Sequence, residues 1–403
     1  MNRRVAITGI GLVTALGATR ESTWQRLVAG ECGVRPLTVF DSAGYRSRIA
    51  AEVETAPISA QLTPLQRRRW SRGDQFGVVA AREAVADAGL PAGYAPTRIG
   101  VLLGAGTSDL LRNEDFYRVM NARGLKFARP SDAWNHFSST PVDLIAGDFG
   151  FEGLRSCVVA ACSSSTIAIG RAADAIRTGR LDAALTGGTD ALARLTFSGF
   201  NALKLMDPEP CRPFDRGRAG MSIGEGAAIL VLEEMSGAWA RGAHVYGELA
   251  GYSFGCEAFH PTAPEPDGRP VAAIVGQALR DAGAQPDEVD HVNAHATATP
   301  QNDRAEARGL RSVFGERSAR LPVNGLKSMV GHCLGAAGGI EAAVLALSVE
   351  RGIIPPTIHH GETDPECPVD VVGNDAREVR IRCGVSTSLG FGGNDSALVI
   401  RAV

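Results

Sequence analysis

The sequence of 403 residues predicts an α/β fold built from two related halves. Apolar, strand-like runs alternate with segments of helical spacing along the chain. The second half restates the pattern of the first, which indicates an internal duplication. The hydrophobic content of 44% allows a large core, and the length favours two domains or two fused halves.

The first half is expected to begin with a strand and to return to the sheet several times. The run RRVAITGIG at 3–11 is apolar and ends in a glycine-rich turn, which is typical of a first buried strand. Residues 22–33 predict a short helix, capped by Ser22 and ending near Gly30. A longer helical pattern covers 75–90 and ends at Gly89. Further buried strands are expected at 98–106, 181–192 and 227–234.

Residues 108–150 interrupt this alternation with a polar, aromatic stretch that we expect to be irregular. Insertions of this kind often cover a site or form a subunit interface. The second half then repeats the first: 290–299 is a strand entering a polar loop, and 321–352 has the strand, loop and small-residue helix of 155–179. The two halves are placed at 1–245 and 246–403.

Composition excludes several classes of function. The net charge of −3 gives no case for nucleic acid or a membrane surface as main partner. The sequence has no run of about 18 apolar residues, and its beginning is interpreted as a strand and not as a signal peptide. The eight cysteines are scattered without a CxxC pair or zinc-like set, which favours a reduced, cytoplasmic protein.

The stretch VVAACSSSTIAIG, 158–170, places a single thiol where a strand ends and a helix begins. A Cys162 thiolate there would face unpaired N–H groups and the positive end of the helix dipole, both of which lower a thiol pKa. Its own backbone N–H could donate to a bound carbonyl oxygen. A buried, inert cysteine is an equally good interpretation of this stretch alone.

Other polar residues lie at similar junctions in the second half. His295 directly follows a predicted strand, and Lys327 and His332 occupy a glycine-flanked loop before a helix. Taken singly, each fits a structural histidine or a solvated lysine. The glycine-rich turn in 384–400 lacks a P-loop Lys-Ser/Thr, and the glycines at 9, 11 and 17 miss the dinucleotide spacing, so nucleotide binding is disfavoured.

The combination is far more specific than its parts. With Cys162, His295, Lys327, His332 and a terminal GFGG in this order, the sequence resembles the β-ketoacyl-acyl-carrier-protein synthases, in their Cys-His-His branch. The resemblance runs from RRVAITGIGLVTALG through CRPFDRGRAGMSIGEGAAILVLEE to GFGGNDSALVI. It implies the thiolase fold, with duplicated βαβαβαββ halves in five layers, α-β-α-β-α.

The resemblance also implies a reaction. Cys162 would be acylated by a thioester, and His295 and His332 would assist decarboxylation of a malonyl thioester, whose enolate attacks the acyl-cysteine. Neutral histidine N–H groups would stabilise the enolate oxygen. The backbone N–H groups of Cys162 and Phe391 would serve the acylation step, and Phe391 would also act as a gate. No metal or redox cofactor is needed, because loss of CO2 drives the condensation.

Supporting roles follow from the same resemblance. Lys327 would pair with Glu306 to hold the histidines and their loop, with Asp303 as further support. The phosphopantetheine arm would bind Thr297, Thr299 and Thr262. Residues that hold a monovalent cation in some relatives match Asn293, Glu341 and Ser386. An acidic acyl carrier protein would dock on basic side chains, for which the candidates are Arg67, Arg68, Arg69, Arg72 and Arg212.

Departures from the family pattern concern specificity rather than catalytic groups. Ala296 stands where glycine is usual and is expected to need an ordinary backbone conformation. Leu389 stands where elongating relatives commonly have Phe, so the resemblance does not define the acyl specificity or the gate motion. The chain could therefore serve fatty-acid elongation or a polyketide or polyene pathway. A homodimer is expected, with a heterodimer containing a chain-length-factor-like subunit as the alternative.

Three other functions remain to be weighed. A non-catalytic chain-length-factor-like subunit would typically lack the cysteine that stands at 162. A thiolase would carry a second cysteine near the C-terminal glycine loop, where Cys383 lies just ahead of GFGG. A Cys-His-Asn starter enzyme would need Asn at position 332.

Overall fold

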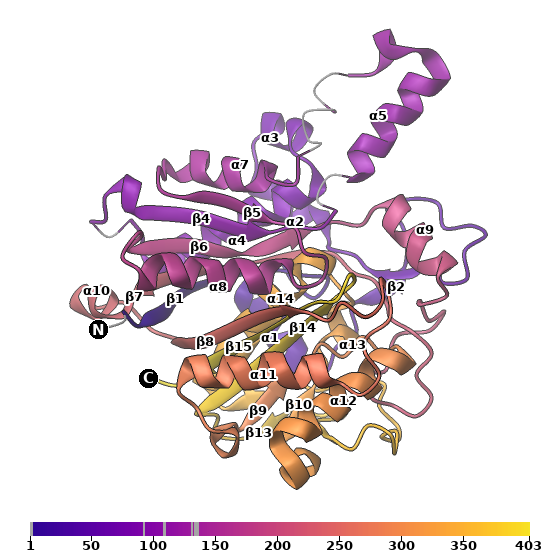
Figure 1. Cartoon of the computed structure of the whole chain (residues 1–403). Coiled ribbons are helices and arrows are strands. Elements are labelled where there is room, and N and C mark those ends of the chain that lie inside the picture. Colours follow the sequence, from indigo (N-terminus) through magenta and orange to yellow (C-terminus); the bar gives the residue numbers. More distant parts are fainter. Residues whose placement is uncertain (1–2, 92, 108–109, 130–131, 133–136) are drawn as a thin grey trace.

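The computed structural model describes residues 3–91, 93–107, 110–129, 132 and 137–403, and shows a layered α/β protein (Figure 1). Its first half contains, in order, β1 (Val5–Val13), α4 (Arg72–Ala88), β4 (Ile99–Gly104), α7 (Thr140–Phe149), β5 (Arg155–Val158), α8 (Ser164–Arg177), β6 (Ala183–Asp190) and β7 (Gly226–Glu234). The second contains β8 (Gly247–Cys256), α11 (Arg269–Ala282), β9 (His291–Asn293), α12 (Pro300–Phe314), β10 (Pro322–Asn324), α14 (Ala337–Arg351), β14 (Cys383–Gly390) and β15 (Asn394–Arg401).

Both halves follow the order βαβαβαββ, and their strands pair in the same way. The first strand of each half is antiparallel to the last, the last is antiparallel to the strand before it, and the remaining neighbours are parallel. The two halves meet edge to edge where β1 pairs with β8, at Ala6↔Glu248 and Ile7↔Gly247. The predicted duplicated architecture is confirmed.

Five layers arise because the halves share a central pair of helices. Helices α4 and α7 contact the outer face of the first half-sheet, α11 and α12 flank the second, and α8 and α14 contact strands of both (Figure 1). Every residue of α14 from Ala337 to Val349 is buried, which is expected of a helix with sheet on two sides. The layering brings the loops before α8 and α14 to one central place.

The glycines of β1 serve this packing. A Cβ atom at Gly11 would lie 1.9 Å from the carbonyl oxygen of Ala80, and one at Gly9 would lie 2.3 Å from that of Ala84. Both contacts are with α4, so these glycines allow a helix to approach the strand closely. They have a structural role, in agreement with the absence of dinucleotide spacing.

The other α-helices and strands of the described residues are α1 (Arg20–Val28), β2 (Val34–Pro36), β3 (Ile49–Ala51), α2 (Thr55–Ala60), α3 (Pro64–Arg69), α5 (Leu110–Arg123), α9 (Arg194–Ala202), α10 (Met235–Ala240), α13 (Lys327–Val330), β11 (Ile353–Ile354), β12 (Asp370–Val371) and β13 (Arg377–Glu378). No helix in the described ranges is long and apolar enough to cross a membrane.

Two expectations of the sequence analysis are wrong here. The cap of α1 is Thr19, and Ser22 is instead the third helical residue, which completes a reciprocal capping box with it. The segment 108–150 is not irregular throughout, because it contains α5 and α7. Helix α7 belongs to the outer layer of the fold, whereas α5 stands away from the body (Figure 1). Residues 108–109, 130–131 and 133–136 of this segment lie outside the described residues.

Candidate active site

Cys162 lies in a tight turn between β5 and α8 and is buried, with 7% of its surface exposed. Ala161 before it has φ of 49°, in the left-handed region that a non-glycine residue seldom adopts. The Ser163 hydroxyl donates to the carbonyl oxygens of Ser388 (2.9 Å) and Asn394 (2.5 Å), and the Ser164 hydroxyl donates to that of Ala161 (2.7 Å). The serines therefore hold the turn that presents the thiol.

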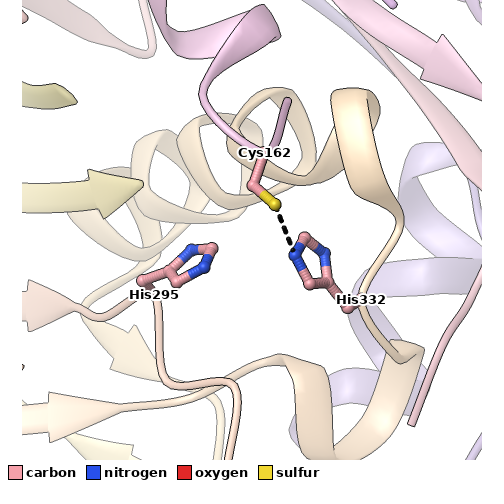
Figure 2. Close-up of side chains that lie close together, drawn as sticks. All are labelled: Cys162, His295 and His332. Atoms are coloured by element: carbon pink, nitrogen blue, oxygen red, sulfur yellow. Dashed lines mark hydrogen bonds between the residues drawn. The ribbon is translucent and has the colours of Figure 1, made fainter. Parts of the chain in front are cut away.

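His332 contacts the sulfur directly. Its Nε2 lies 3.0 Å from Cys162 Sγ, and its Nδ1 accepts the backbone N–H of Leu334 at 3.1 Å (Figure 2). Because Nδ1 is an acceptor, the neutral ring carries its hydrogen on Nε2, which points at the sulfur. His295 faces the same space, with its ring centroid 5.3 Å from that of His332 and the rings nearly perpendicular at 86°.

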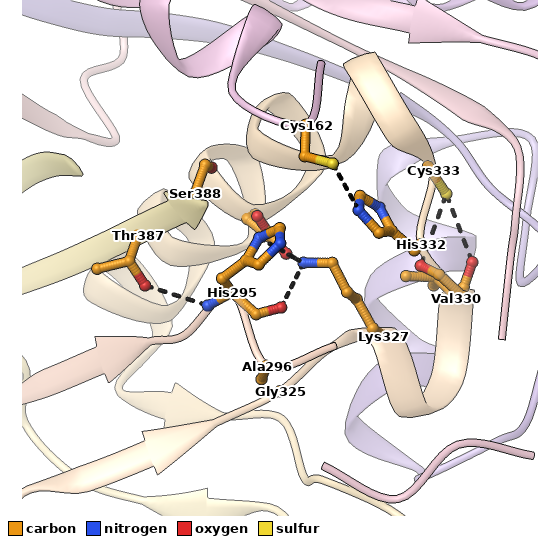
Figure 3. A network of polar contacts seen from close by, with 12 residues as sticks. Cys162, His295, Ala296, Gly325, Lys327, Val330, His332, Cys333, Thr387 and Ser388 are labelled. Atoms are coloured by element: carbon orange, nitrogen blue, oxygen red, sulfur yellow. Dashed lines mark hydrogen bonds and ion pairs between the residues drawn. The ribbon is translucent and has the colours of Figure 1, made fainter. Parts of the chain in front are cut away.

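Lys327 is buried close to His295 (Figure 3), and it forms an ion pair with Glu341 of α14. Its Nζ also donates to the carbonyl oxygen of His295 at 2.5 Å and lies 3.3 Å from His295 Nδ1. A donor at Nδ1 leaves the ring hydrogen on Nε2, as in His332. Lys327 thus fixes both the position and the tautomer of His295.

The predicted ion pair between Lys327 and Glu306 is wrong. The Glu306 carboxylate accepts the backbone N–H groups of His295 and Ala296, each at 2.8 Å, and the hydroxyl of Thr387 at 2.6 Å. Glu306 projects from α12 on the backbone side of the loop, whereas Glu341 comes from the central helix α14. Glu306 still supports the histidine loop, through hydrogen bonds to its backbone.

Burial dominates the electrostatics of the site. Burial, and then the charge of Lys327, hold the pKa of both His295 and His332 well below the ordinary value, so both rings are neutral. Burial also raises the pKa of the Cys162 thiol to about 11, against the charge of Lys327 and the backbone N–H groups of Phe391 and Cys162. The predicted lowering of the thiol pKa is therefore wrong for the resting site, because desolvation outweighs the local N–H donors.

The expectation for Ala296 is also wrong. Ala296 has φ of 46° and Ala298 has φ of 64°, so both occupy the left-handed conformation that glycine adopts more readily. Three hydrogen bonds to carboxylates hold this loop: the backbone N–H groups of His295 and Ala296 donate to Glu306, and that of Ala298 donates to Asp303 at 3.0 Å. The loop therefore has the left-handed backbone conformation that suits glycine, although alanine occupies position 296.

We expect Ala296→Gly to raise the free energy of unfolding by up to about 1 kcal/mol. The left-handed alanine costs about 1–2 kcal/mol, and the flexibility of glycine in the unfolded chain returns about 0.5–1 kcal/mol. Urea unfolding measures the difference. Ala294→Gly is the matched control, because Ala294 is buried in the same loop at an ordinary φ and its replacement should destabilise. Equal destabilisation by both changes would contradict the assigned strain.

A pocket opens onto the thiol. Its lining includes Cys162, His332 and Phe391, together with the three predicted pantetheine-binding residues, Thr262, Thr297 and Thr299. The structure thus brings these threonines and the nucleophile to one cavity, although pantetheine binding itself stays a prediction. Sequence reasoning missed two acidic residues of the same lining, Glu257 and Asp395. In the sequence, these acids are distinguished only by lying next to the two loops that line the pocket.

The other supporting candidates are also placed. Asp303 accepts the N–H of Phe214 at 2.8 Å, in addition to that of Ala298, and so braces the loop. Asn293 and Ser386 are neighbours in the β9–β14 pairing. Both polar side-chain atoms of Asn293 and Oε2 of Glu341 are buried and lack a hydrogen-bond partner among the described residues. These oxygens fit the ligands of a hard cation.

The candidate docking arginines do not form one patch. Arg67, Arg68 and Arg69 are exposed in the last turn of α3. Arg72 forms an ion pair with the buried Glu225 and is structural. Arg212 lies beside α13, since the adjacent Cys211 thiol donates to the carbonyl oxygen of Lys327 at 3.2 Å. Figure 1 shows α3 and α13 in separate parts of the molecule.

Comparisons with known proteins agree with this fold and site. Residues 2–238 match the beta-ketoacyl synthase N-terminal domain, and residues 246–361 match the C-terminal domain of the same family. The chain is 40% identical over 412 residues to the tetracenomycin polyketide synthase ketoacyl synthase alpha subunit of Streptomyces glaucescens, covering 99% of this chain and 97% of the relative. It is 37% identical over 407 residues to 3-oxoacyl-[acyl-carrier-protein] synthase 2 of Staphylococcus aureus (strain COL), covering 99% and 98%.

Among solved structures, the ishigamide ketosynthase/chain length factor superposes with a TM-score of 0.94 at 37% identity, over all of both chains. The duplicated halves and the buried Cys-His-His group define a condensing enzyme of the thiolase fold. Within that class, the chain belongs to the beta-ketoacyl synthase family.

Proposed function

We propose that this ketosynthase carries an acyl group on Cys162 and condenses it with malonyl-acyl-carrier protein, with loss of CO2, to give a 3-oxoacyl-acyl-carrier protein. The observation that carries the assignment of residues is the 3.0 Å contact between Cys162 Sγ and the N–H-bearing Nε2 of a neutral His332. A second neutral histidine, His295, faces the same space. The names of the relatives, which describe ketoacyl synthases, support the reaction class.

In the first half-reaction, the sulfur of Cys162 attacks the acyl thioester, and the pantetheine thiol leaves. One thiol enters and one departs, so the proton released by Cys162 is taken up by the leaving thiol. The backbone N–H groups of Cys162 and Phe391 donate to the thioester oxygen as it becomes negative. Covalent capture separates acyl transfer from carbon–carbon bond formation.

In the second half-reaction, the malonyl carboxylate leaves as CO2, and the electrons of the broken bond form an enolate. The Nε2–H groups of His295 and His332 donate to its oxygen. The enolate carbon attacks the acyl-cysteine, which releases the Cys162 thiolate and forms the 3-oxoacyl product. The thiolate then takes up one proton from solvent, which restores the resting thiol. Lys327 acts as a positioning residue, because its bonds reach His295 and Glu341 and leave the reacting space to the histidines.

The reaction as proposed uses no metal or redox cofactor. Cys162, His295 and His332 lie close enough to hold an ion. However, a ligating Nε2 would need its hydrogen on Nδ1, and in His332 that atom already accepts the Leu334 N–H. The second sphere thus favours hydrogen-bond donation over metal ligation. A monovalent cation bound by Asn293, Glu341 and Ser386 would be structural.

The alternatives fit the geometry less well. A non-catalytic chain-length-factor-like subunit has no need for a cysteine that is hydrogen-bonded to a histidine, as Cys162 is to His332. Cys383 cannot supply the base of a thiolase, because it lies at the far end of β14 from the active site. Cys383 begins this strand, whereas Gly390, at its other end, lies next to the active site. Eight residues of strand place those two ends about 23 Å apart. A starter-type enzyme with Asn at the position of His332 is excluded by the residue itself.

The partner is an acyl carrier protein, and Arg67, Arg68 and Arg69 are its proposed docking residues. We propose a homodimer, with a heterodimer containing a chain-length-factor-like subunit as the alternative that the ishigamide structure suggests. We further place the protein in the cytoplasm, because all eight cysteines are free thiols, as in a reducing compartment.

A panel of acyl-carrier proteins tests the proposal. We expect wild-type protein to gain the mass of one acyl group, located on the peptide that contains Cys162, from at least one donor of the panel. Intact-protein mass spectrometry followed by peptide mapping gives the result. Failure of every donor to acylate Cys162 would contradict the proposal and favour the partner-subunit alternative.

A further inference from the structure

The glycine-rich loop 390–393 is tied to the segment 256–265 across the mouth of the pocket. The backbone N–H of Glu257 donates to the carbonyl oxygen of Gly393 at 2.9 Å, and that of Gly392 donates to the carbonyl oxygen of Pro261 at 2.8 Å. Gly393 has φ of 73°, and a Cβ atom there would lie 2.9 Å from the Cβ of Glu257. The two segments are therefore in close contact, and both line the cavity above Cys162.

A second connection between them joins two acids. Asp395, next to the loop at the start of β15, has 1% of its surface exposed, and its carboxyl group lies within hydrogen-bonding reach of the Glu257 carboxyl group. Asp395 Oδ2 has no hydrogen-bond donor among the described residues. Glu257 Oε2 accepts the backbone N–H of Glu265 at 2.9 Å. Two carboxyl groups in such contact cannot both be ionised without strong repulsion, so a proton between them satisfies the orphaned oxygen.

The surroundings favour this protonated state. Burial, then the charge of Glu257 and the hydrogen bond to it, raise the pKa of Asp395 to about 8, against the backbone N–H of Gly390. Glu306 of α12 adds further negative charge. Of the other titratable groups of the segment, His260 Nδ1 accepts the N–H groups of Thr262 and Ala263, each at 3.1 Å, and Glu265 pairs with Arg269. The exposed Cys256 thiol faces the loop itself and donates to the carbonyl oxygen of Gly392 at 3.9 Å.

We propose that Asp395 and Glu257 share one proton, and that this acid pair locks the loop bearing Phe391 against the segment 256–265. Loss of the proton places two carboxylates in contact across the junction and loosens the loop. The acid pair is thus a positioning element that makes access to Cys162 depend on pH. The assignment of the cavity to an acyl chain rests on the proposed function, whereas the lock is a property of the free protein.

The direction of the pH dependence follows from the raised pKa. The hydrogen-bonded form predominates below about pH 8 and is lost as the pH rises through that value. Above it, each further pH unit lowers the protonated fraction about tenfold. The extra ordering of the loop should fall in the same proportion until only the remaining hydrogen bonds between the loop and the segment hold it.

Hydrogen exchange of the full-length protein, measured from about pH 7 to about pH 10, tests the lock. After correction for intrinsic exchange, the protection of amides in 390–393 is expected to fall by up to about tenfold per pH unit above the pKa in the wild type. In Asp395→Asn, the amide donates to Glu257 without a charge, so protection should stay constant. Infrared difference spectra between the two pH limits should show a protonated carboxyl band that Asp395→Asn removes.

Two further variants complete the test. Glu257→Gln removes the same repulsion from the other side and should likewise abolish the pH dependence. Glu83→Gln is the matched control, because Glu83 is a partly buried acid with a raised pKa, distant from the loop, and its replacement should leave the wild-type profile unchanged. Loop exchange that is independent of pH in the wild type, or equally dependent in Asp395→Asn, would overturn the proposal.

The lock and the proposed function fail in distinguishable ways. A protein that never acylates at Cys162 but shows the pH-dependent loop would refute the function and keep the lock. A protein that condenses normally with a pH-independent loop would refute only the lock. If both hold, the rate of Cys162 acylation should change with pH in the wild type differently from that in Asp395→Asn.

Discussion

Replacing Cys162 by Ala is expected to abolish formation of the 3-oxoacyl product, with a loss of at least about 10³-fold against wild type. The sulfur is the atom that holds the acyl group between the two half-reactions, and alanine offers no nucleophile in its place. The turn around it should persist, because its hydrogen bonds come from Ser163 and Ser164. Product formation from acyl- and malonyl-carrier protein, followed by mass spectrometry, measures the effect.

Cys333→Ala provides the matched control for this change. Cys333 is buried next to His332 in sequence, its thiol donates to the carbonyl oxygen of Val330 at 3.4 Å, and burial raises its pKa. Like Cys162 it is a buried thiol, but its sulfur points toward Val330 and not into the space between Cys162 and the two histidines (Figure 3). Its replacement should leave Cys162 acylation intact. Condensation by purified Cys162→Ala protein would disprove the assignment of the nucleophile.

The sequence predicts the main geometry of the site for a physical reason. In a duplicated α/β fold, the loops that follow corresponding strands lie at the same edge, so polar residues after strands of both halves meet. Cys162, His295 and His332 each stand at such a junction, and the structure brings them together (Figure 2). The fold class follows in the same way, because the alternation of strand and helix is visible in each half.

What the sequence could not predict depends on tertiary packing. Which residue of α14 pairs with Lys327 depends on how the helix is rotated about its axis. Because α14 is buried on all sides, its sequence has no polar face that would show this rotation. The thiol pKa of Cys162 depends on how completely the fold excludes water, whereas the sequence shows only the neighbouring helix terminus. The left-handed Ala296 is likewise held by Glu306, which is contributed by another element.

The contact between Glu257 and Asp395 could not be predicted from the sequence either. Glu257 and Asp395 are ordinary acids in the sequence, each beside a loop with its own turn residues. Their contact exists because β8 and β15 pair in an antiparallel register that sets Gly255 against Asp395 and Asn394 against Cys256. A register shift of one residue would place the Asp395 side chain on the other face of the sheet.

The two histidine variants, His295→Ala and His332→Ala, are expected to separate the half-reactions. Each removes one neutral N–H donor from the developing enolate oxygen, which should slow malonyl decarboxylation by about 10²–10³-fold. Acylation of Cys162 should survive in both, because its oxygen is served by backbone N–H groups. Decarboxylation is measured as the release of labelled CO2, and acylation is measured by intact-protein mass spectrometry.

The structure further predicts that the two variants differ from each other. His332 Nε2 touches the sulfur, so His332→Ala should slow acylation as well, whereas His295→Ala should leave it nearly unchanged. His291→Ala serves as control, since His291 is buried in the same strand region, has a pKa lowered by burial to about 4, and bonds to the carbonyl oxygen of Pro322 at 3.1 Å outside the site. Wild-type decarboxylation in both variants would show that the enolate is stabilised by other groups. Loss of acylation as complete as in Cys162→Ala would instead mean that the thiol requires a histidine before it can attack.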